Sequence, residues 1–543
     1  MKADKPTSSD PSAMELGTLD GSPLNKDVDA AIAQNPDKFP KAVWFILPNE
    51  FGERFTYYAV SAFINRYLQF IGASAESAKL STHSWKMITY FCPLFGAALS
   101  DSYFGKYKTI VGLSFIYLLG NIVLVVTSIP SFRTLGSVSA GLYLIAVGTG
   151  GIKPCVGPHG GDQFLPTQGD LLRRFFALFY IAINLGSLLT GFVTPALKDA
   201  TSCWGDAIKS KEPGVPDTTF CYTAGFALPT AVFLVSFAVF VYGDRYYRVA
   251  PPQGEFVPYK MLLVTWDAVR AYIGGERTMT SGPDAAGFFS LGAGRFGLQF
   301  AQDTGEFLSV LAVIFPIAFV WMVYDQQSTE WQQQYDRMNQ VFFGANISPE
   351  TWIAVVNPVL VVSLLYVLAT IVYPFLETRI GVRVTPLRRM VLGSALVMAG
   401  FLVSGWLQGS VMADFDGETD AKGFQVPHSC KNCVHGAWQM PQWILLSLGE
   451  AMFSPTGNEF AYTQVSESMK AISSSFWLLL VAIGNLSVVL VEDAVSSSSW
   501  ATFPSGDSRP AKFYLYTGIG AVAVLWLAVG ASRFKYKPGT ESA

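Results

Sequence analysis

Long apolar segments recur along this chain, and each is long enough to cross a lipid bilayer as a helix. A span needs about 20 mostly apolar residues, and we count about twelve segments of that length. They run roughly over 41–69, 83–100, 108–130, 137–157, 175–195, 223–243, 306–325, 351–374, 388–408, 441–462, 471–492 and 513–532. Because 51% of the 543 residues are apolar and only 14% are charged, we predict an all-α, multi-pass membrane protein.

Basic residues gather at alternate ends of these segments. Such ends face the cytoplasm under the positive-inside rule, and both termini fall on the same side. The clusters are KYK at 106–108, RR at 173–174, DRYYR at 244–248, the arginines between 379 and 389, and the RFKYK tail.

Changes in composition divide the chain into five parts. Residues 1–40 are rich in Asp, Ser, Pro, Lys and Gly and are predicted to be a disordered cytoplasmic tail. Residues 244–305 are predicted to be a cytoplasmic linker, in which YKMLLVTWDAVRAYI suits a helix on the membrane surface. Residues 41–243 and 306–536 then form two six-helix bundles, and 537–543 a short cytoplasmic tail. Two such halves suggest alternating access around a site at the midplane.

The first segment carries three charges inside PNEFGERFTYY, at Glu50, Glu53 and Arg54. A charge at the centre of a membrane helix costs about 2.5–3.5 kcal/mol on insertion scales. The charges share one helical face with Tyr57 and Tyr58, so this face is predicted to line a polar cavity. The alternative is an ion pair that only stabilises the fold. That alternative explains the stretch poorly, because Arg54 can neutralise one of the two acids, Glu50 and Glu53, and the other then has no base.

Other segments supply polar groups for the same cavity. Lys153 in GTGGIKPCV and Glu450 in LGEAMFSPTG are a lone cation and a lone anion in opposite halves, and we predict that they pair. The glycines before Lys153 are expected to serve close helix packing, and a phosphate loop is not indicated because the Walker spacing, with Lys followed by Ser or Thr, is missing. The further polar candidates are Tyr180, Asn184, Trp321, Asp325, Gln326, Asn357 and Ser454.

The predicted outer loops hold the remaining candidates. Cys203 and Cys221 flank one loop and are disulfide candidates, and Asn346 in NIS is a candidate for glycosylation. HSCKNCVH has residue types that suit zinc, but its histidine spacing lies outside the usual finger frame, and we predict no metal site.

Several motifs in order resemble the proton-coupled oligopeptide transporters, a branch of the major facilitator superfamily. The pattern ExxERFxYY runs from Glu50 to Tyr58, and GGIKPCV, GGDQF, FYIAINLGSL, DQQS and GEAMFSPTG follow it. The resemblance extends over about 41–536 and is strongest to the animal-type di- and tripeptide transporters. It implies peptide and proton symport, with protons as the coupling ion and no cofactor.

The resemblance also implies roles for single residues. Glu50, Glu53 and Arg54 match the proton-coupling cluster, and His83 matches a histidine that animal members use in coupling. Lys153, Asp325 and Glu450 match gating residues. The residues that match peptide-binding positions are Arg54, Tyr58, Tyr90, Lys153, Tyr180, Asn184, Trp321, Asn357, Glu450, Ser454 and Trp477.

These roles agree with the chemistry of a dipeptide, which is a zwitterion with charges a fixed distance apart. Arg54 and Lys153 suit its carboxylate and Glu450 its amino group. The unperturbed pKa of a histidine such as His83 is about 6.5, which suits the sensing of an acidic exterior. We expect partners among small peptides, protons and the lipid bilayer but not nucleic acid, with the plasma membrane favoured over an acidic organelle; the oligomeric state stays open.

One position departs from the animal-type pattern. Ser309 stands where the seventh span of those members carries an arginine, and no Lys or Arg lies between 296 and 336. The gating pair of that arginine is therefore in doubt. Three alternatives remain: a carrier of nitrate or another small solute, a peptide sensor without transport, and a membrane-embedded enzyme. The intact ExxER pattern argues against a carrier of another solute, and the short C-terminal tail argues against a sensor. The four histidines are scattered along the chain, which argues against an enzyme.

Overall fold

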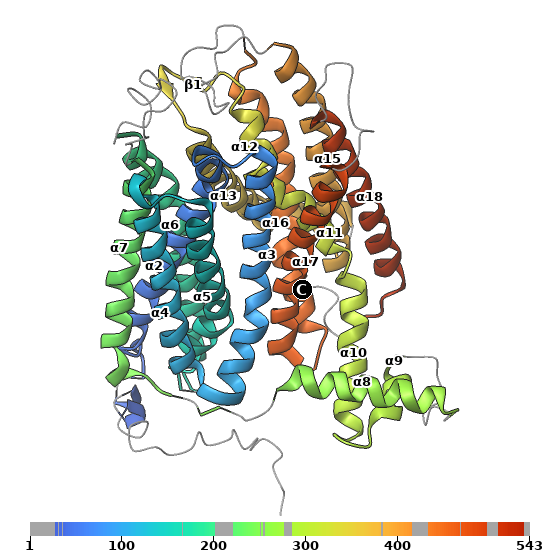
Figure 1. Ribbon diagram of the computed structural model, residues 1–543. Coiled ribbons are helices and arrows are strands. Elements are labelled where there is room, and N and C mark those ends of the chain that lie inside the picture. Colours follow the sequence, from blue (N-terminus) through green and yellow to red (C-terminus); the bar gives the residue numbers. More distant parts are fainter. Residues whose placement is uncertain are drawn as a thin grey trace, which may run out of the picture.

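Figure 1 shows the computed structural model, which is helical throughout its body. The structure describes residues 28–30, 32–34, 36–165, 167–200, 221–249, 251–252, 256–275, 285–381, 384–414, 433–466, 469–496 and 509–536. The N-terminal half contains α2 (Val43–Phe70), α3 (Ala75–Leu99), α4 (Lys106–Ser128), α5 (Leu135–Gly161), α6 (Gly169–Ala200) and α7 (Cys221–Tyr242). The linker contains α8 (Val257–Ile273) and α9 (Ala285–Phe289).

The C-terminal half begins with a bent span. Its helices are α10 (Leu298–Ile314), α11 (Ile317–Tyr324), α12 (Glu330–Tyr335), α13 (Pro349–Val367), α14 (Tyr373–Phe375), α15 (Pro386–Ala413), α16 (Met440–Thr463), α17 (Lys470–Ser496) and α18 (Arg509–Arg533). The segment Asp325–Ser328 joins α11 to α12 as a 3₁₀ turn, η5. A short hairpin of β1 (Val341–Phe342) and β2 (Ala345–Asn346) follows.

The number of long helices agrees with the predicted spans. Within the described residues, eight helices are long and apolar enough to cross a membrane. The segments Leu298–Ile314 and Ile317–Tyr335 meet at an angle of 43° and together count as a ninth span. Pro316 lies at this bend, where it cannot donate a helical hydrogen bond. The helices α2, α3 and α16 have 28, 25 and 24 residues and bring the total to the predicted twelve. These three carry charges within their length, which lowers their hydropathy.

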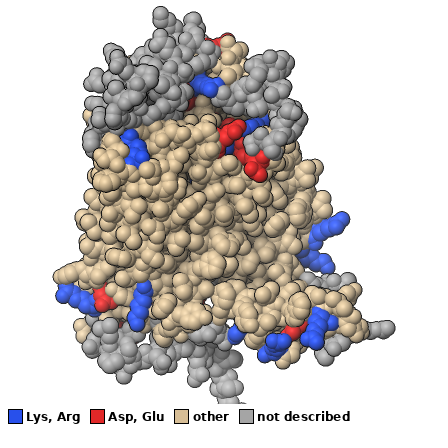
Figure 2. All heavy atoms as spheres, viewed as in Figure 1, with Lys and Arg blue, Asp and Glu red and all other residues tan. Residues whose placement is uncertain are grey.

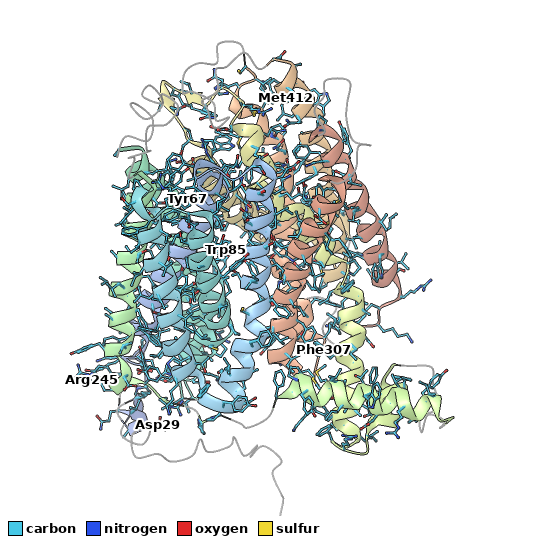
Figure 3. All side chains as sticks on the ribbon, viewed as in Figure 1. Asp29, Tyr67, Trp85, Arg245, Phe307 and Met412 are labelled. Atoms are coloured by element: carbon cyan, nitrogen blue, oxygen red, sulfur yellow. The ribbon has the colours of Figure 1, made fainter. Side chains whose placement is uncertain are left out.

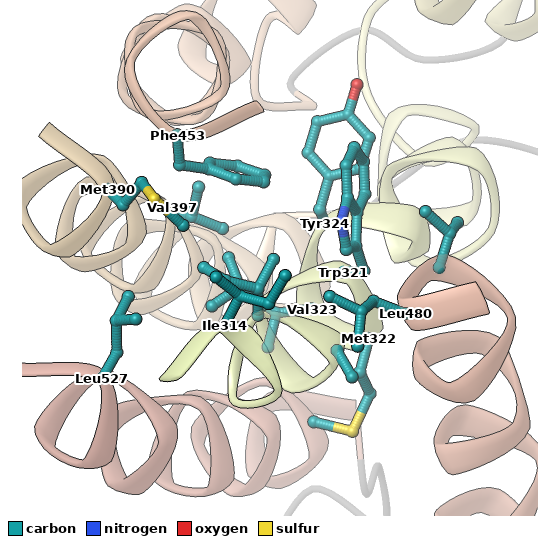
Figure 4. Packing of buried hydrophobic residues seen from close by; sticks show 14 of the residues in the cluster. Ile314, Trp321, Met322, Val323, Tyr324, Met390, Val397, Phe453, Leu480 and Leu527 are labelled. Atoms are coloured by element: carbon teal, nitrogen blue, oxygen red, sulfur yellow. The ribbon is translucent and has the colours of Figure 1, made fainter. Parts of the chain in front are cut away.

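Each half has a hydrophobic core of its own. One cluster of buried residues draws on positions between Ala42 and Tyr247, and a second on positions between Met261 and Leu527. Figure 4 shows part of the second cluster, in which Trp321, Tyr324 and Phe453 pack together. Two separate cores allow the halves to move relative to each other as compact bodies.

The distribution of charge marks the two ends of the molecule. Figure 2 shows a broad tan band, with most Lys, Arg, Asp and Glu gathered above and below it. Asp29 and Arg245 lie at the lower end, Met412 at the upper end, and Tyr67 and Trp85 between them (Figure 3). The linker helix α8 lies across the lower end and the hairpin at the upper end (Figure 1), so the lower end is the predicted cytoplasmic side.

Part of the predicted tail contacts the N-terminal half at this lower end. Asp29 pairs with Arg248, and the side-chain amide of Gln168 donates to the carbonyl of Pro36 at 2.9 Å. Residues 1–27, 31 and 35 lie outside the described residues, so for them the disorder predicted for 1–40 stays a prediction, whereas the described part of 28–40 is partly helical and makes these contacts.

The linker helix α8 has two apolar faces. Met261, Val264 and Ala268 are buried against the linker and the C-terminal half, whereas Leu262 and Trp266 are 65% and 61% exposed. The predicted helix is confirmed, and its exposed face suits the boundary between headgroups and acyl chains. Its place on the membrane surface stays a prediction.

Glycines bring helices of the N-terminal half into close contact, as expected for the GTGGIK stretch. A Cβ on Gly150 of α5 would lie 2.4 Å from the backbone oxygen of Thr89 on α3, and one on Gly148 would lie 2.6 Å from the backbone of Tyr117 on α4. Real Cβ atoms do not approach backbone atoms so closely, so the spacing of α3, α4 and α5 depends on these glycines.

We therefore expect Gly150→Ala to destabilise the protein. The methyl group would force α5 away from α3, at a cost of about 1–3 kcal/mol for an overpacked contact. The unfolding temperature of the purified protein in detergent should fall. Gly112→Ala in α4 is the matched control, because a Cβ there meets nothing within 4 Å. Equal unfolding temperatures for the two variants would contradict this account of the packing.

Candidate functional site

The charged stretch of the first span forms a compact buried cluster on α2. The Nε atom of Arg54 lies 2.8 Å from Glu50 Oε1 and 2.8 Å from Glu53 Oε2. The hydroxyl of Thr149, from α5, donates to Glu53. Glu50 and Glu53 are 3% and 1% exposed, so both acids depend on the same arginine for charge compensation.

A cavity of about 1210 Å³ lies between the two halves. Lys153 and Tyr180 line it from the N-terminal half, and Glu450, Ser454 and Trp477 from the C-terminal half. Its walls continue to Asp101, Lys106, Pro251 and Lys470, which lie at helix ends or in the connection toward the linker. The cavity therefore extends toward the predicted cytoplasmic side.

Lys153 and Glu450 face this cavity without forming an ion pair. Lys153 Nζ lies 4.2 Å from the ring centroid of Tyr57 and 5.3 Å from that of Tyr90. Glu450 accepts a hydrogen bond of 3.0 Å from Asn357, whose amide also donates to the Tyr324 hydroxyl at 2.8 Å. No acid pairs with Lys153 and no base with Glu450 among the described residues. The predicted contact between them is absent because the cavity separates the halves.

The other predicted binding residues lie around this pair at different depths. Tyr180 is 51% exposed, and its backbone carbonyl accepts a hydrogen bond from Asn184. Trp477 is 6% exposed and packs against Gly457. Trp321 is 8% exposed and belongs to the core of the C-terminal half. Tyr58 is half-buried and interacts electrostatically with both Arg54 and Glu450, so it links the α2 cluster to the opposite half.

On the side away from the linker, charged pairs join the two halves. All the bases come from the N-terminal half and the acids from the C-terminal half. Lys86 Nζ lies 2.9 Å from Asp325 Oδ1, and Lys198 Nζ lies 2.9 Å from Glu350 Oε1. The further pairs are Arg66 with Asp336 and Glu350, and Lys79 with Glu330 and Glu492. These buried contacts close the cavity on the predicted outer side.

His83 lies within this closed interface. Its Nδ1 is 2.8 Å from Asn485 Oδ1 on α17, and its Nε2 is 3.1 Å from Thr329 Oγ1 at the start of α12. The side chain has no exposed surface. Both ring nitrogens of the histidine therefore contact groups of the opposite half.

Sequence reasoning found the α2 cluster, Lys153, Asp325 and Glu450 but missed most of the outer pairs. Lys79, Lys86 and Glu492 are charged residues inside or beside apolar segments, which is the signal that drew attention to Glu53. Ser309 donates to the backbone of Gly305 at 2.8 Å and has no charged role. The bases that pair across the halves come from α2, α3 and α6 of the N-terminal half.

The structure describes some of the candidates in the outer loops and not others. Cys203, His428, Cys430 and the side chain of Cys221 lie outside the described residues. Cys433 is disulfide-bonded. The ring nitrogens of His435 meet the Val341 carbonyl at 2.9 Å and the Ala437 amide at 3.1 Å. Asn346 lies in β2, half-buried, and its glycosylation stays a prediction.

Two helical bundles around a charged cavity, closed on one side by ion pairs, define a membrane transporter of the major facilitator type. A family model described as the POT family matches residues 107–505. The chain belongs to this family of transporters, as the motifs predicted, and not to a family of enzymes.

Individual relatives agree with this assignment. Peptide transporter family 1 of Drosophila melanogaster is 36% identical over 387 residues, which are 70% of this chain and 49% of that protein. Solute carrier family 15 member 2 of Homo sapiens is 32% identical over 373 residues, which are 67% of this chain and 48% of that protein. The chain thus spans about half the length of the curated relatives it matches. The crystal structure of the POT family transporter PepTSo has a TM-score of 0.69 at 26% identity and covers 91% of this chain and 98% of that one.

Proposed function

We propose that this protein imports di- and tripeptides together with protons by alternating access. The observation that carries the proposal is that Lys153 and Glu450 lie on opposite walls of one cavity and that neither has an ion-pair partner among the described residues. A peptide backbone has one negative and one positive end, so it can bridge these walls. The side chains of the peptide are then free to vary within the large cavity.

In this proposal the α2 cluster couples the proton to the peptide. Arg54 lies against Glu50 and Glu53, and Lys153 interacts electrostatically with all three. Protonation of Glu53 would weaken its hold on Arg54, and the guanidinium would then be available to the peptide carboxylate. Proton binding and peptide binding therefore favour each other.

The closed outer side and the cavity toward the linker correspond to the inward-facing stage of this cycle. Separation of the outer pairs and contact of Lys153 with Glu450 would give the opposite stage. With both termini and the linker in the cytoplasm, this direction of movement is import, and the plasma membrane is the expected location.

Uptake of a labelled, hydrolysis-resistant dipeptide by vesicles that hold the purified protein tests the proposal. We expect accumulation above equilibrium only with an inward proton gradient. Absence of peptide flux with and without the gradient, by protein shown to be folded, would reject peptide transport. A gradient-driven flux of nitrate or another small solute in the same vesicles would then identify a different cargo, and peptide binding without flux would identify a sensor.

Glu450→Gln tests the binding mode separately. The wild type should prefer a dipeptide with a free amino group over its N-acetylated form, because only the free amine carries the charge that Glu450 attracts. A charge-assisted hydrogen bond contributes about 1.5–3 kcal/mol, so the variant should lose about 10- to 100-fold of this preference in competition assays. Glu377→Gln is the matched control, since Glu377 is exposed and remote from the cavity lining. An unchanged preference in Glu450→Gln would place the amino group elsewhere.

A further inference from the structure

The hydrogen-bond partners of His83 are neutral groups from the opposite half. Asn485 donates its amide hydrogens to Asp325 Oδ2 at 2.6 Å and to the Val481 carbonyl at 3.0 Å. Its oxygen is therefore the atom that faces His83 Nδ1, at 2.8 Å. The amide stands between the imidazole and the carboxylate, so His83 and Asp325 are linked without being in contact.

Asp325 already has a charged partner within this interface. Lys86 Nζ lies 2.9 Å from Asp325 Oδ1 and donates to Ser328 Oγ at 2.9 Å. Lys86 is 5% exposed and lies one helical turn beyond His83 on α3. The same carboxylate is thus held by a lysine through one oxygen and by the Asn485 amide through the other.

The charged groups around His83 can be identified element by element. On α3, Lys79 and Lys86 interact electrostatically with His83, as does Asp325 of η5 from the other half. Lys79 is itself compensated by Glu330 of α12 and Glu492 of α17. From α2, the neutral Tyr57 stacks on Trp85, and from α5, Lys153 lies over the Tyr57 ring. Lys86 and Asp325 therefore remain as the charged pair near His83. A single substitution of Lys86 would leave Asp325 without its base and so change the net charge near the imidazole.

We propose that Lys86 sets the pH range in which His83 binds its proton, by holding the Asp325 carboxylate in an ion pair and away from the imidazole. This inference rests on the proposed function, because the proton concerned is the one that drives uptake. With Lys86 present, Asp325 contributes little attraction for an imidazolium, and the ammonium repels it. With Lys86 neutral, the carboxylate attracts the imidazolium through the short Asn485 bridge. Lys86 thus acts through Asp325 and is a positioning residue that need not touch the peptide.

Lys86→Met removes the charge and keeps an unbranched side chain of similar length. We expect the pH of half-maximal dipeptide uptake to rise by about one unit, the size of effect that a neighbouring charge produces. The shift is alkaline because the protonated form of His83 becomes more stable. Lys86→Arg keeps the charge and should keep the wild-type midpoint.

A second variant separates charge from packing. In Lys86→Met/Asp325→Asn both partners are neutral, and the midpoint should return toward that of the wild type even where the maximal rate is low. A midpoint in Lys86→Met equal to that of the wild type would overturn the inference. So would a double variant shifted as far as the single one, because the loss of the ion-pair geometry would then be the cause.

The titration of His83 can also be measured in purified protein without transport. This measurement applies to variants that fold but do not carry peptide. The chain has four histidines, so ¹³C-histidine NMR of the purified protein can follow each ring, with His83→Gln to assign the signal of His83. The titration of that signal should move to higher pH in Lys86→Met, and no movement would overturn the inference. Wild-type vesicles that show no gradient-dependent uptake at any pH would instead reject the proposed function, whatever the titration shows.

Discussion

Glu53→Gln should abolish the accumulation of peptide while leaving exchange of peptide across the membrane. Glutamine keeps the size of glutamate and can still accept hydrogen bonds from Thr149 and Arg54, but it cannot gain or lose a proton in this pH range. Arg54 would retain Glu50 at 2.8 Å as its partner, so the helix should keep its charge compensation and its fold.

The expected loss is large because, in the proposed cycle, the proton supplies the whole driving force. One charge crossing 100 mV yields about 2.3 kcal/mol and one pH unit about 1.4 kcal/mol, which together support a gradient of several hundred-fold, on the order of 10². In Glu53→Gln the final ratio of internal to external peptide should be about one. Counterflow of labelled dipeptide, measured without a gradient, should persist.

Glu377→Gln is the control for this experiment as well, because it makes the same chemical change at an exposed position. Normal accumulation by Glu53→Gln would show that the proton is carried elsewhere, with Glu50 and His83 the next groups to test. Loss of both accumulation and counterflow, in protein that unfolds at the wild-type temperature, would show that Glu53 is needed for movement of the halves and not for coupling alone.

The sequence was sufficient to locate the α2 cluster because local patterns identify it. Glu50, Glu53 and Arg54 share one helical face, and the spacing of residues on a helix fixes that arrangement before any tertiary contact is known. The twelve segments were found for a similar reason, since each depends on its own length and hydropathy. The boundaries shifted most in the seventh span, where the break at Pro316 and the turn Asp325–Ser328 interrupt a longer helical segment.

Contacts between the halves could not be predicted in this way. Lys79 meets Glu330, 251 positions along the chain, and Lys86 meets Asp325 after 239 positions, so no local spacing connects them. For Lys153 and Glu450 the prediction was wrong in the other direction: the two residues were predicted to form a pair, and the cavity separates them. Complementary charge shows which residues suit each other, but the conformation of the transporter decides which of them touch.

We expect the conformation to depend on single charged residues of the outer interface, and Lys79 is the clearest case. Lys79 is 3% exposed and compensates two buried acids of the other half, Glu330 and Glu492. Glu492 also has Lys512 at 3.0 Å and the Tyr516 hydroxyl at 2.8 Å. Among the described residues, the side chain of Glu330 pairs with Lys79 alone.

Lys79→Met should therefore favour the state that is open on the outer side. In the closed interface the variant leaves Glu330, 3% exposed, as a buried charge without its base, which costs about 3–5 kcal/mol. In the open state the same carboxylate meets water. The equilibrium between the two states should shift by about 10²- to 10⁴-fold toward outward-facing protein, and the rate of uptake should fall because the inward-facing stage becomes rare.

Distances between spin labels on the outer ends of the two halves can measure this shift in purified protein. The wild type should show mainly the short distances of a closed outer side, and Lys79→Met mainly longer ones. Lys79→Arg keeps the charge and should resemble the wild type, while Lys79→Met/Glu330→Gln removes the unpaired acid and should restore a closed population. Short distances in Lys79→Met would mean that Glu330 is protonated or solvated in the closed state, and the outer ion pairs would then be a consequence of closure and not a cause of it.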